Sequence, residues 1–157
     1  MSRLAIAALT LLLGVTAASA DFRTGMEAYE AGDFETAYRE WLPLAEGGNA
    51  AAQFNVGLLH EQGEGREADI DRALTWYARS AENGFAKAQF RLGEIYEAGA
   101  SVERDLIEAR KWFAVAAESR YPKAKKRKKR VADEMTPKEI ALGDMWARVF
   151  LEKRKSR

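Results

Sequence analysis

The sequence repeats itself at an interval of 36 residues. When residues 51–86 are laid over 87–122 without gaps, 13 of the 36 positions are identical. Several mismatches keep their character, among them Ile70/Leu106 and Tyr77/Phe113. An interval of this length is typical of chains in which a small unit, unable to bury its apolar face alone, stacks against its copies. We therefore expect a row of stacked units rather than a closed globule.

Each unit is predicted to begin with a helix. Apolar or small residues recur from Ala52 at the i, i+4, i+7 spacing of one helical face. Gly57 and Gly93 lie at the same point of the two units, where glycine costs about 1 kcal/mol against alanine. Their recurrence indicates that a neighbouring helix comes close. Gly63 and Gly99 are expected to end this helix, as C-terminal glycines do.

A second helix is expected to follow in each unit. Asp69 and Asp105 are suited to its start, because a short carboxylate accepts hydrogen bonds from the free N–H groups there. An earlier copy, with a shorter loop, precedes these units, since Asp33 and Ala37 stand 36 residues before Asp69 and Ala73.

These segments resemble the Sel1-like repeat, a relative of the tetratricopeptide repeat. The matching stretches are AAQFNVG and KAQFRLG, then EQGEG and EAGAS in the loop, then ALTWYARSAENG and ARKWFAVAAESR. The resemblance covers about residues 22–122 and departs from the pattern at Arg120, which replaces a closing glycine. It implies an all-α, right-handed solenoid of stacked helix pairs, in a family whose members serve mostly as adaptor surfaces.

The first twenty residues have the pattern of a secretory signal peptide. Arg3 is the only charged residue before Asp21, an apolar stretch follows it, and the stretch ends in small residues suited to cleavage after Ala20. A membrane-spanning helix needs roughly 20 apolar residues, and the run from 4 to 18 is shorter. The sequence therefore predicts a mature chain in the periplasm. The predicted organisation is a signal peptide (1–20), a truncated repeat (21–50), two repeats (51–86, 87–122), a basic degenerate repeat helix (123–135), and a capping helix with a frayed tail (136–157).

The composition argues against catalysis. With no cysteine and a single histidine, the chain lacks disulfides, thiolate nucleophiles and multi-histidine metal sites. His60 is expected to be a packed, hydrogen-bonded core residue. Glu64, Glu67 and Asp69 cluster near one loop, but their spacing is not that of an EF-hand. No catalytic residue, metal ligand, cofactor or small-molecule substrate is predicted.

Charge is divided unequally along the chain. Residues 21–119 hold 10 Lys/Arg and 19 Asp/Glu, whereas residues 120–157 hold 14 and 5. The basic run has three interpretations. A nucleic-acid patch is disfavoured, because no aromatic residues interleave with the cations. Anionic lipid head groups are the second, and the water-facing side of a terminal repeat is the third and favoured one. The candidate anionic-surface residues are Lys123, Lys125, Lys126, Arg127, Lys128, Lys129 and Arg130.

A further helix is predicted from Thr136. Thr136 and Glu139 form a capping box, and Pro137 stands at the first helical position. The apolar residues that follow, up to about Leu151, make the helix amphipathic. We expect it to fold back over the open end of the stack, with partner binding as the alternative.

The function predicted from the sequence is that of a non-enzymatic adaptor that binds a protein or peptide. The concave face, built from the first helices, is the expected contact surface. Pairs that diverge between the repeats, such as Asn55/Arg91, are expected to set specificity, whereas identical pairs can be structural. The alternative function is docking on anionic lipid through residues 120–130. The candidate partner-binding residues are Gln53, Asn55, Leu58, Glu61, Gln89, Arg91, Glu94 and Glu97.

Overall fold

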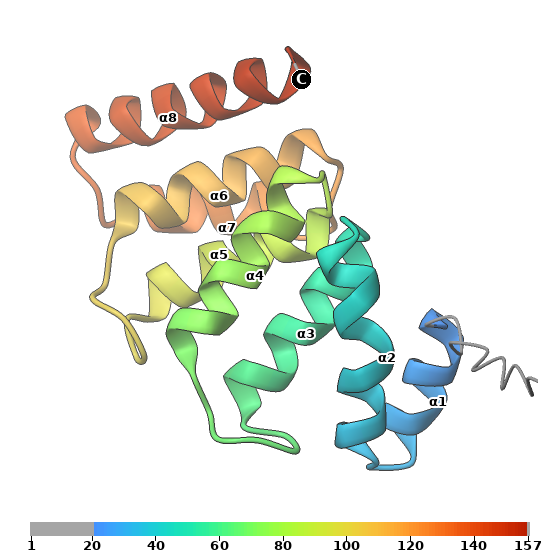
Figure 1. The fold of residues 1–157 in the computed structure, drawn as a ribbon. Coiled ribbons are helices and arrows are strands. Elements are labelled where there is room, and N and C mark those ends of the chain that lie inside the picture. Colours follow the sequence, from blue (N-terminus) through green and yellow to red (C-terminus); the bar gives the residue numbers. More distant parts are fainter. Residues whose placement is uncertain (1–20, 157) are drawn as a thin grey trace, which may run out of the picture.

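The computed structural model describes residues 21–156, which form eight α-helices and contain no strand (Figure 1). The predicted signal peptide, residues 1–20, lies outside the described residues. The helices are α1 (Phe22–Glu30), α2 (Phe34–Glu46), α3 (Ala50–Gln62), α4 (Ile70–Glu82), α5 (Ala86–Ala98), α6 (Leu106–Glu118), α7 (Ala124–Ala132) and α8 (Pro137–Lys155).

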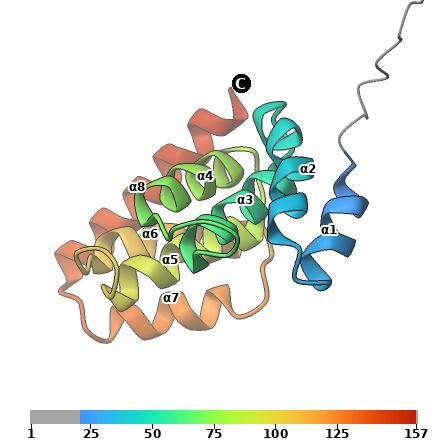
Figure 2. The ribbon, with the colours of Figure 1, turned by 60° about the horizontal axis from the view of Figure 1, so that its bottom comes forward.

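Helices α1 to α6 form three consecutive hairpins, and these hairpins stack in a row. Each first helix packs on the second helix of its own pair, and α2 also packs on α3, α4 on α5 and α6 on α7. The second and third pairs begin at Ala50 and Ala86, 36 residues apart. Figure 2 shows α7 continuing the row beside α5 and α6. The expected all-α solenoid of stacked helix pairs is confirmed.

Two glycines bring the helices of each pair into close contact. A Cβ atom at Gly57 would lie 2.8 Å from Cε1 of Tyr77, and one at Gly93 would lie 2.6 Å from Cε1 of Phe113. Both rings are fully buried. The aromatic ring of the second helix therefore rests directly on the backbone of the first, as the recurrence of the glycines predicts.

The predicted helix ends are also confirmed. Gly63 and Gly99 adopt left-handed conformations, with φ of 70° and 62°, and end α3 and α5. Asp69 and Asp105 accept hydrogen bonds from backbone N–H groups in the first turns of α4 and α6. These contacts satisfy donors that a helix start leaves without an internal partner.

The apolar core follows the row instead of filling one centre. It forms a cluster around Trp41 between α1, α2 and α3, a second around Tyr77, and a third around Phe113. Ala124 and Val131 of α7 are fully buried in the third cluster, and Met135, which follows the helix, packs against it.

The position of α8 differs from the expectation. It lies along α6 and leaves the outer surface of α7 open (Figure 1). The ring of Trp112 in α6 meets that of Phe150 edge-on, with centroids 5.1 Å apart. At Gly143 the two backbones come close, because a Cβ there would lie 3.1 Å from the Ile107 carbonyl oxygen. The physical reason is that α6 offers apolar side chains, whereas the outer surface of α7 offers lysines.

Candidate functional site

A groove with a volume of about 500 Å³ opens along α5, between α3 and the start of α7. Its walls combine aromatic rings with cations, and only one carboxylate is among them. The lining residues are Phe54, Lys87, Phe90, Arg91, Glu94, Tyr121, Pro122, Lys123 and Arg127. These come from consecutive repeats, so the stacking of the repeats creates the groove.

Aromatic rings form the floor of the groove. The centroids of Phe90 and Tyr121 are 4.7 Å apart, and those of Phe54 and Phe85 are 5.5 Å apart. The ammonium group of Lys87 lies 4.7 Å from the ring centre of Phe54, within the range of a cation–π contact. The cation is thus held beside the floor while its side chain remains exposed.

Arg91 is held in place by the preceding repeat. Its guanidinium donates to both carboxylate oxygens of Glu61, from Nε at 3.0 Å and from Nη2, while Tyr77 donates its hydroxyl to Oε2 of Glu61 at 2.7 Å. Burial alone would lower the pKa of Arg91, but the hydrogen bonds and charge of Glu61 outweigh it and raise the pKa. Burial, followed by the hydrogen bond to Glu61, raises the pKa of Tyr77. At neutral pH both Tyr77 and Arg91 therefore keep their protons and donate them to Glu61.

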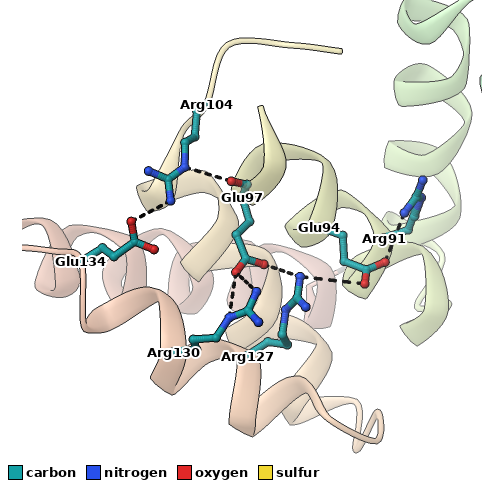
Figure 3. A network of polar contacts seen from close by, with 7 residues as sticks. All are labelled: Arg91, Glu94, Glu97, Arg104, Arg127, Arg130 and Glu134. Carbon is teal, nitrogen blue, oxygen red and sulfur yellow. Dashed lines mark hydrogen bonds and ion pairs between the residues drawn. The ribbon is translucent and has the colours of Figure 1, made fainter. Parts of the chain in front are cut away.

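The next repeat contains a matching network (Figure 3). Arg127 and Arg130 both donate to Glu97, with Nη2 at 2.5 Å from a carboxylate oxygen in each case. Glu97 and Arg127 are 30 residues apart, as are Glu61 and Arg91. The hydrogen bond to Glu97 raises the pKa of Arg130. Two cations of the basic segment are therefore paired with a carboxylate of the preceding repeat.

Two of the predicted partner-binding residues are buried and structural. The exposed fraction of Gln53 is 4% and that of Gln89 is 0%. Their Nε2 atoms donate to the carbonyl oxygens of Ala45 and Ala81, at 2.9 and 3.1 Å. Because these carbonyls lie in the last turns of α2 and α4, the amides satisfy acceptors that a helix end leaves free. These two glutamines are thus removed from the candidate contact surface.

The other predicted contact residues have partners within the chain. Leu58 packs against the second apolar cluster, the one around Tyr77, and Asn55 donates to Sδ of Met26 at 3.6 Å. Glu61 and Glu97 are engaged by arginines, whereas Arg91 and Glu94 line the groove.

The aromatic floor and Lys87 were not among the predicted contact residues. Phe54 and Phe90 occupy the same point of the two repeats, as do Lys87 and Lys123. The interval that reveals the fold could therefore have identified these residues too.

The predicted anionic-surface residues also divide into two groups. Arg127 and Arg130 bind Glu97, and the Lys128 ammonium lies 3.9 Å from Oδ1 of Asp144. The remainder are exposed, and none of them has a carboxylate partner within the part of the chain that the structure describes. They are Lys123, Lys125, Lys126 and Lys129.

His60 is buried, as predicted, with an exposed fraction of 3%. Its ring meets Tyr38 edge-on, but no residue from 21 to 156 forms a hydrogen bond with its Nδ1. Burial, and then the positive charges of Arg66 and Arg72, lower the pKa of His60. Over the described range, no group of three His, Asp or Glu side chains is placed to hold a metal ion. No described helix has the length and apolar character needed to cross a bilayer.

The model of the Sel1 repeat matches residues 50–85 and 86–121. Among solved structures, the chain is similar to a protective antigen present in uropathogenic Escherichia coli strains, which displays an SLR fold, with 28% identity and a TM-score of 0.76. It is also similar to a Sel1 repeat protein from Oxalobacter formigenes, with 34% identity and a TM-score of 0.67. Each match covers 83% of this chain, but only 29% of the antigen and 56% of the Oxalobacter protein.

No curated protein matches the chain. Sel1 repeats generally mediate protein–protein interactions, on a fold that is typically a non-catalytic scaffold. The matched repeats coincide with the hairpins α3–α4 and α5–α6, whose first helices contribute to the groove. Residues 50–121 are thus two Sel1 repeats, and the described chain shares its fold with Sel1 repeat proteins.

Proposed function

We propose that this chain is a non-enzymatic adaptor that holds a segment of another protein in the groove along α5. The observation that carries the proposal is the floor of Phe54, Phe90 and Tyr121 beside exposed lysines. Trp, Tyr and Arg in recesses most often dominate binding energy between proteins, and Tyr121, Arg91 and Arg127 line this groove. A groove of about 500 Å³ accommodates a few side chains. Its partner is therefore a short segment rather than a whole domain surface.

The proposed compartment is the bacterial periplasm. The basic start, the apolar run and the small residues before Asp21 support it. N-terminal sequencing of the protein released from cells by osmotic shock is expected to begin at Asp21. A protein that stays in the cytoplasm and retains Arg3 would contradict the proposed location. The proposal for the groove does not depend on that result.

The groove is tested by capture of partners from periplasmic extract, followed by chemical cross-linking to locate the contact. Lys87→Glu reverses an exposed charge in the groove, and Lys125→Glu makes the same change on α7 outside it. We expect Lys87→Glu to lose the partner and the matched control to keep it. Equal capture by both variants, or cross-links confined to other surfaces, would refute the groove as the binding site.

Arg91→Glu is a less clear test of the same site. The change removes the partner of Glu61 and places a second carboxylate next to it. A loss of binding in that variant would therefore mix a loss of stability with a loss of contact.

A second candidate function is docking on an anionic membrane surface through α7. Lys125, Lys126 and Lys129 are exposed, and Lys129 follows the other two by four and three residues, which places it beside both on the helix surface. Each such cation is worth about 1 kcal/mol close to an anionic bilayer.

Vesicle sedimentation tests this second function. We expect binding to vesicles that contain phosphatidylglycerol at low salt, and its loss when the three lysines are changed to glutamine. Binding that is insensitive to salt, or equal for pure phosphatidylcholine, would rule it out.

A further inference from the structure

The same set of side chains occurs twice along the groove, once from each step of the row, and all of them line it except Phe85, which contacts Phe54. An aromatic floor residue, a second ring, a lysine and an arginine recur at an interval of 36 residues. The pairs are Phe54/Phe90, Phe85/Tyr121, Lys87/Lys123 and Arg91/Arg127. We propose that these are two equivalent subsites and that together they hold an acidic segment of a partner protein through two of its carboxylates. This inference rests on the proposed function of the groove.

The two subsites have related geometry. In the first, the Phe54 ring contacts the Phe85 ring and the ammonium group of Lys87. In the second, Phe90 contacts Tyr121. Lys87 lies in the first turn of α5, whereas Lys123 is the N-cap of α7 with a φ of 71°, and both lysines are exposed. Each subsite therefore combines an apolar floor with a free ammonium group at its edge.

Internal carboxylates already bind the arginines of both subsites. Arg91 is bound by Glu61, and Arg127 by Glu97. Glu94 lies between the two arginines, 3.3 Å from Nη1 of Arg91 and 4.0 Å from Nη2 of Arg127 (Figure 3). The only carboxylate in the groove is thus taken up by these contacts. The arginines are held as fixed walls, and these carboxylates balance their charge.

The lysines are the charges that remain for a ligand. Among residues 21–156, no carboxylate lies within ion-pair distance of Lys87 or Lys123. The ring contact of Lys87 orients its ammonium group without neutralising it. Two free cations beside an apolar floor are complementary to a segment that carries two acidic residues and an apolar side chain between them.

The state of the floor favours a protein segment over a single-stranded nucleic acid. Nucleobases bind by stacking on open aromatic faces. The exposed fraction of Phe54 is 3% and that of Phe90 is 8%, and both rings already contact other rings. So little of either ring is exposed that neither offers a face for a base to stack on.

The proposal is tested by selecting random twelve-residue peptides, displayed on phage, against the mature protein. We expect the selected peptides to be rich in Asp and Glu with an apolar or aromatic residue between them. Their affinity is expected to fall about fivefold in Lys87→Gln and in Lys123→Gln, and by about the product of the two factors in the double variant. It is expected to fall with added salt as well. Lys125→Gln, an exposed lysine outside the groove, is the matched control.

The outcomes separate this inference from the proposed function. If Tyr121→Ser weakens peptide binding but neither lysine variant does, the groove stands as the binding site and the two acidic subsites are overturned. Selected peptides without acidic residues would have the same meaning. Peptides unaffected by all three changes, or no selected peptides, would overturn both. Since Lys87 and Lys123 are exposed, their variants are expected to fold like the parent, which thermal unfolding checks.

Discussion

Arg91 in α5 binds Glu61 in α3 through two hydrogen bonds, although the two residues are 30 positions apart in the sequence. The pair joins the first helices of consecutive repeats, and Tyr77 in α4 donates to the same carboxylate. At the next step Arg127 and Glu97 make the equivalent connection between α5 and α7. Polar contacts of this kind add to the apolar packing that stacks the hairpins.

Glu61→Gln is expected to lower the free energy of unfolding by about 1–3 kcal/mol, because the amide loses the charge that binds Arg91 and accepts fewer of its hydrogen bonds. Urea unfolding followed by circular dichroism measures the change. Glu27→Gln is the control, since the Arg23–Glu27 pair has side-chain exposures of 81% and 65% and is worth little. A loss in the control as large as that in Glu61→Gln would contradict the prediction.

Gly93→Ala is expected to destabilise the protein by about 1–3 kcal/mol, although alanine favours helix formation. The reason is that the new methyl group would lie 2.6 Å from Phe113 Cε1. Phe113→Leu should recover part of the loss when combined with Gly93→Ala, because it removes the ring that clashes. Losses that simply add in the double variant would show that the ring is not the obstacle.

Stability is expected to fall at high pH because of Tyr77. Its pKa in the folded protein lies above the ordinary value of 10.0, owing to burial and to the Glu61 hydrogen bond. The stabilising contribution is therefore complete below pH 10 and is lost as the pH rises further, since the unfolded chain gives up its proton first. Urea unfolding on both sides of pH 10 measures the slope. Tyr77→Phe should flatten it in part, because the pKa values of Tyr29 and Tyr96 are raised too.

His60 predicts a loss of stability on the acid side. Its pKa is lowered from 6.5, first by burial and then by Arg66 and Arg72. The contribution is fully present above pH 6.5 and declines as the pH falls below it, because the unfolded chain takes up a proton that the folded chain resists. The free energy of unfolding should fall between a pH just above 6.5 and one well below it. This fall should be smaller in His60→Gln than in the parent. An unchanged difference would assign the acid effect to other groups.

Asp144→Asn is expected to loosen α8. Asp144 accepts a hydrogen bond from Arg110 at 2.8 Å, and Arg110, with a side-chain exposure of 8%, also donates to the Lys128 carbonyl oxygen. Weakening the pair leaves a buried cation with one partner fewer, which is costly. Hydrogen exchange should speed up in α8 and remain unchanged in α3. Lys138→Ala, an exposed change in the same helix, should leave the exchange of α8 as it was.

The repeat interval predicts the helix pairs, because residues such as Gly57, Gly63 and Asp69 each have a local physical role that recurs. The position of α8 does not follow from it, since this helix has no copy for comparison. Its amphipathic pattern predicts a buried face without naming the surface that buries it. Gln53 and Gln89 are among the predicted contact residues because polar residue types suggest exposure, although their identity in the two repeats also allows a structural role. Only the structure reveals that the carbonyls of Ala45 and Ala81 lie within reach of their amides.

The Glu–Arg connections also bear on which segments the proposed groove can bind. The Glu97–Arg127 connection joins α5 to α7, the helices at whose starts Lys87 and Lys123 stand, so it helps to fix the spacing of the two proposed subsites. Under the proposal, a segment whose two acidic residues match the spacing of Lys87 and Lys123 binds without any change in the protein. A mismatched segment gains only one of the two contacts.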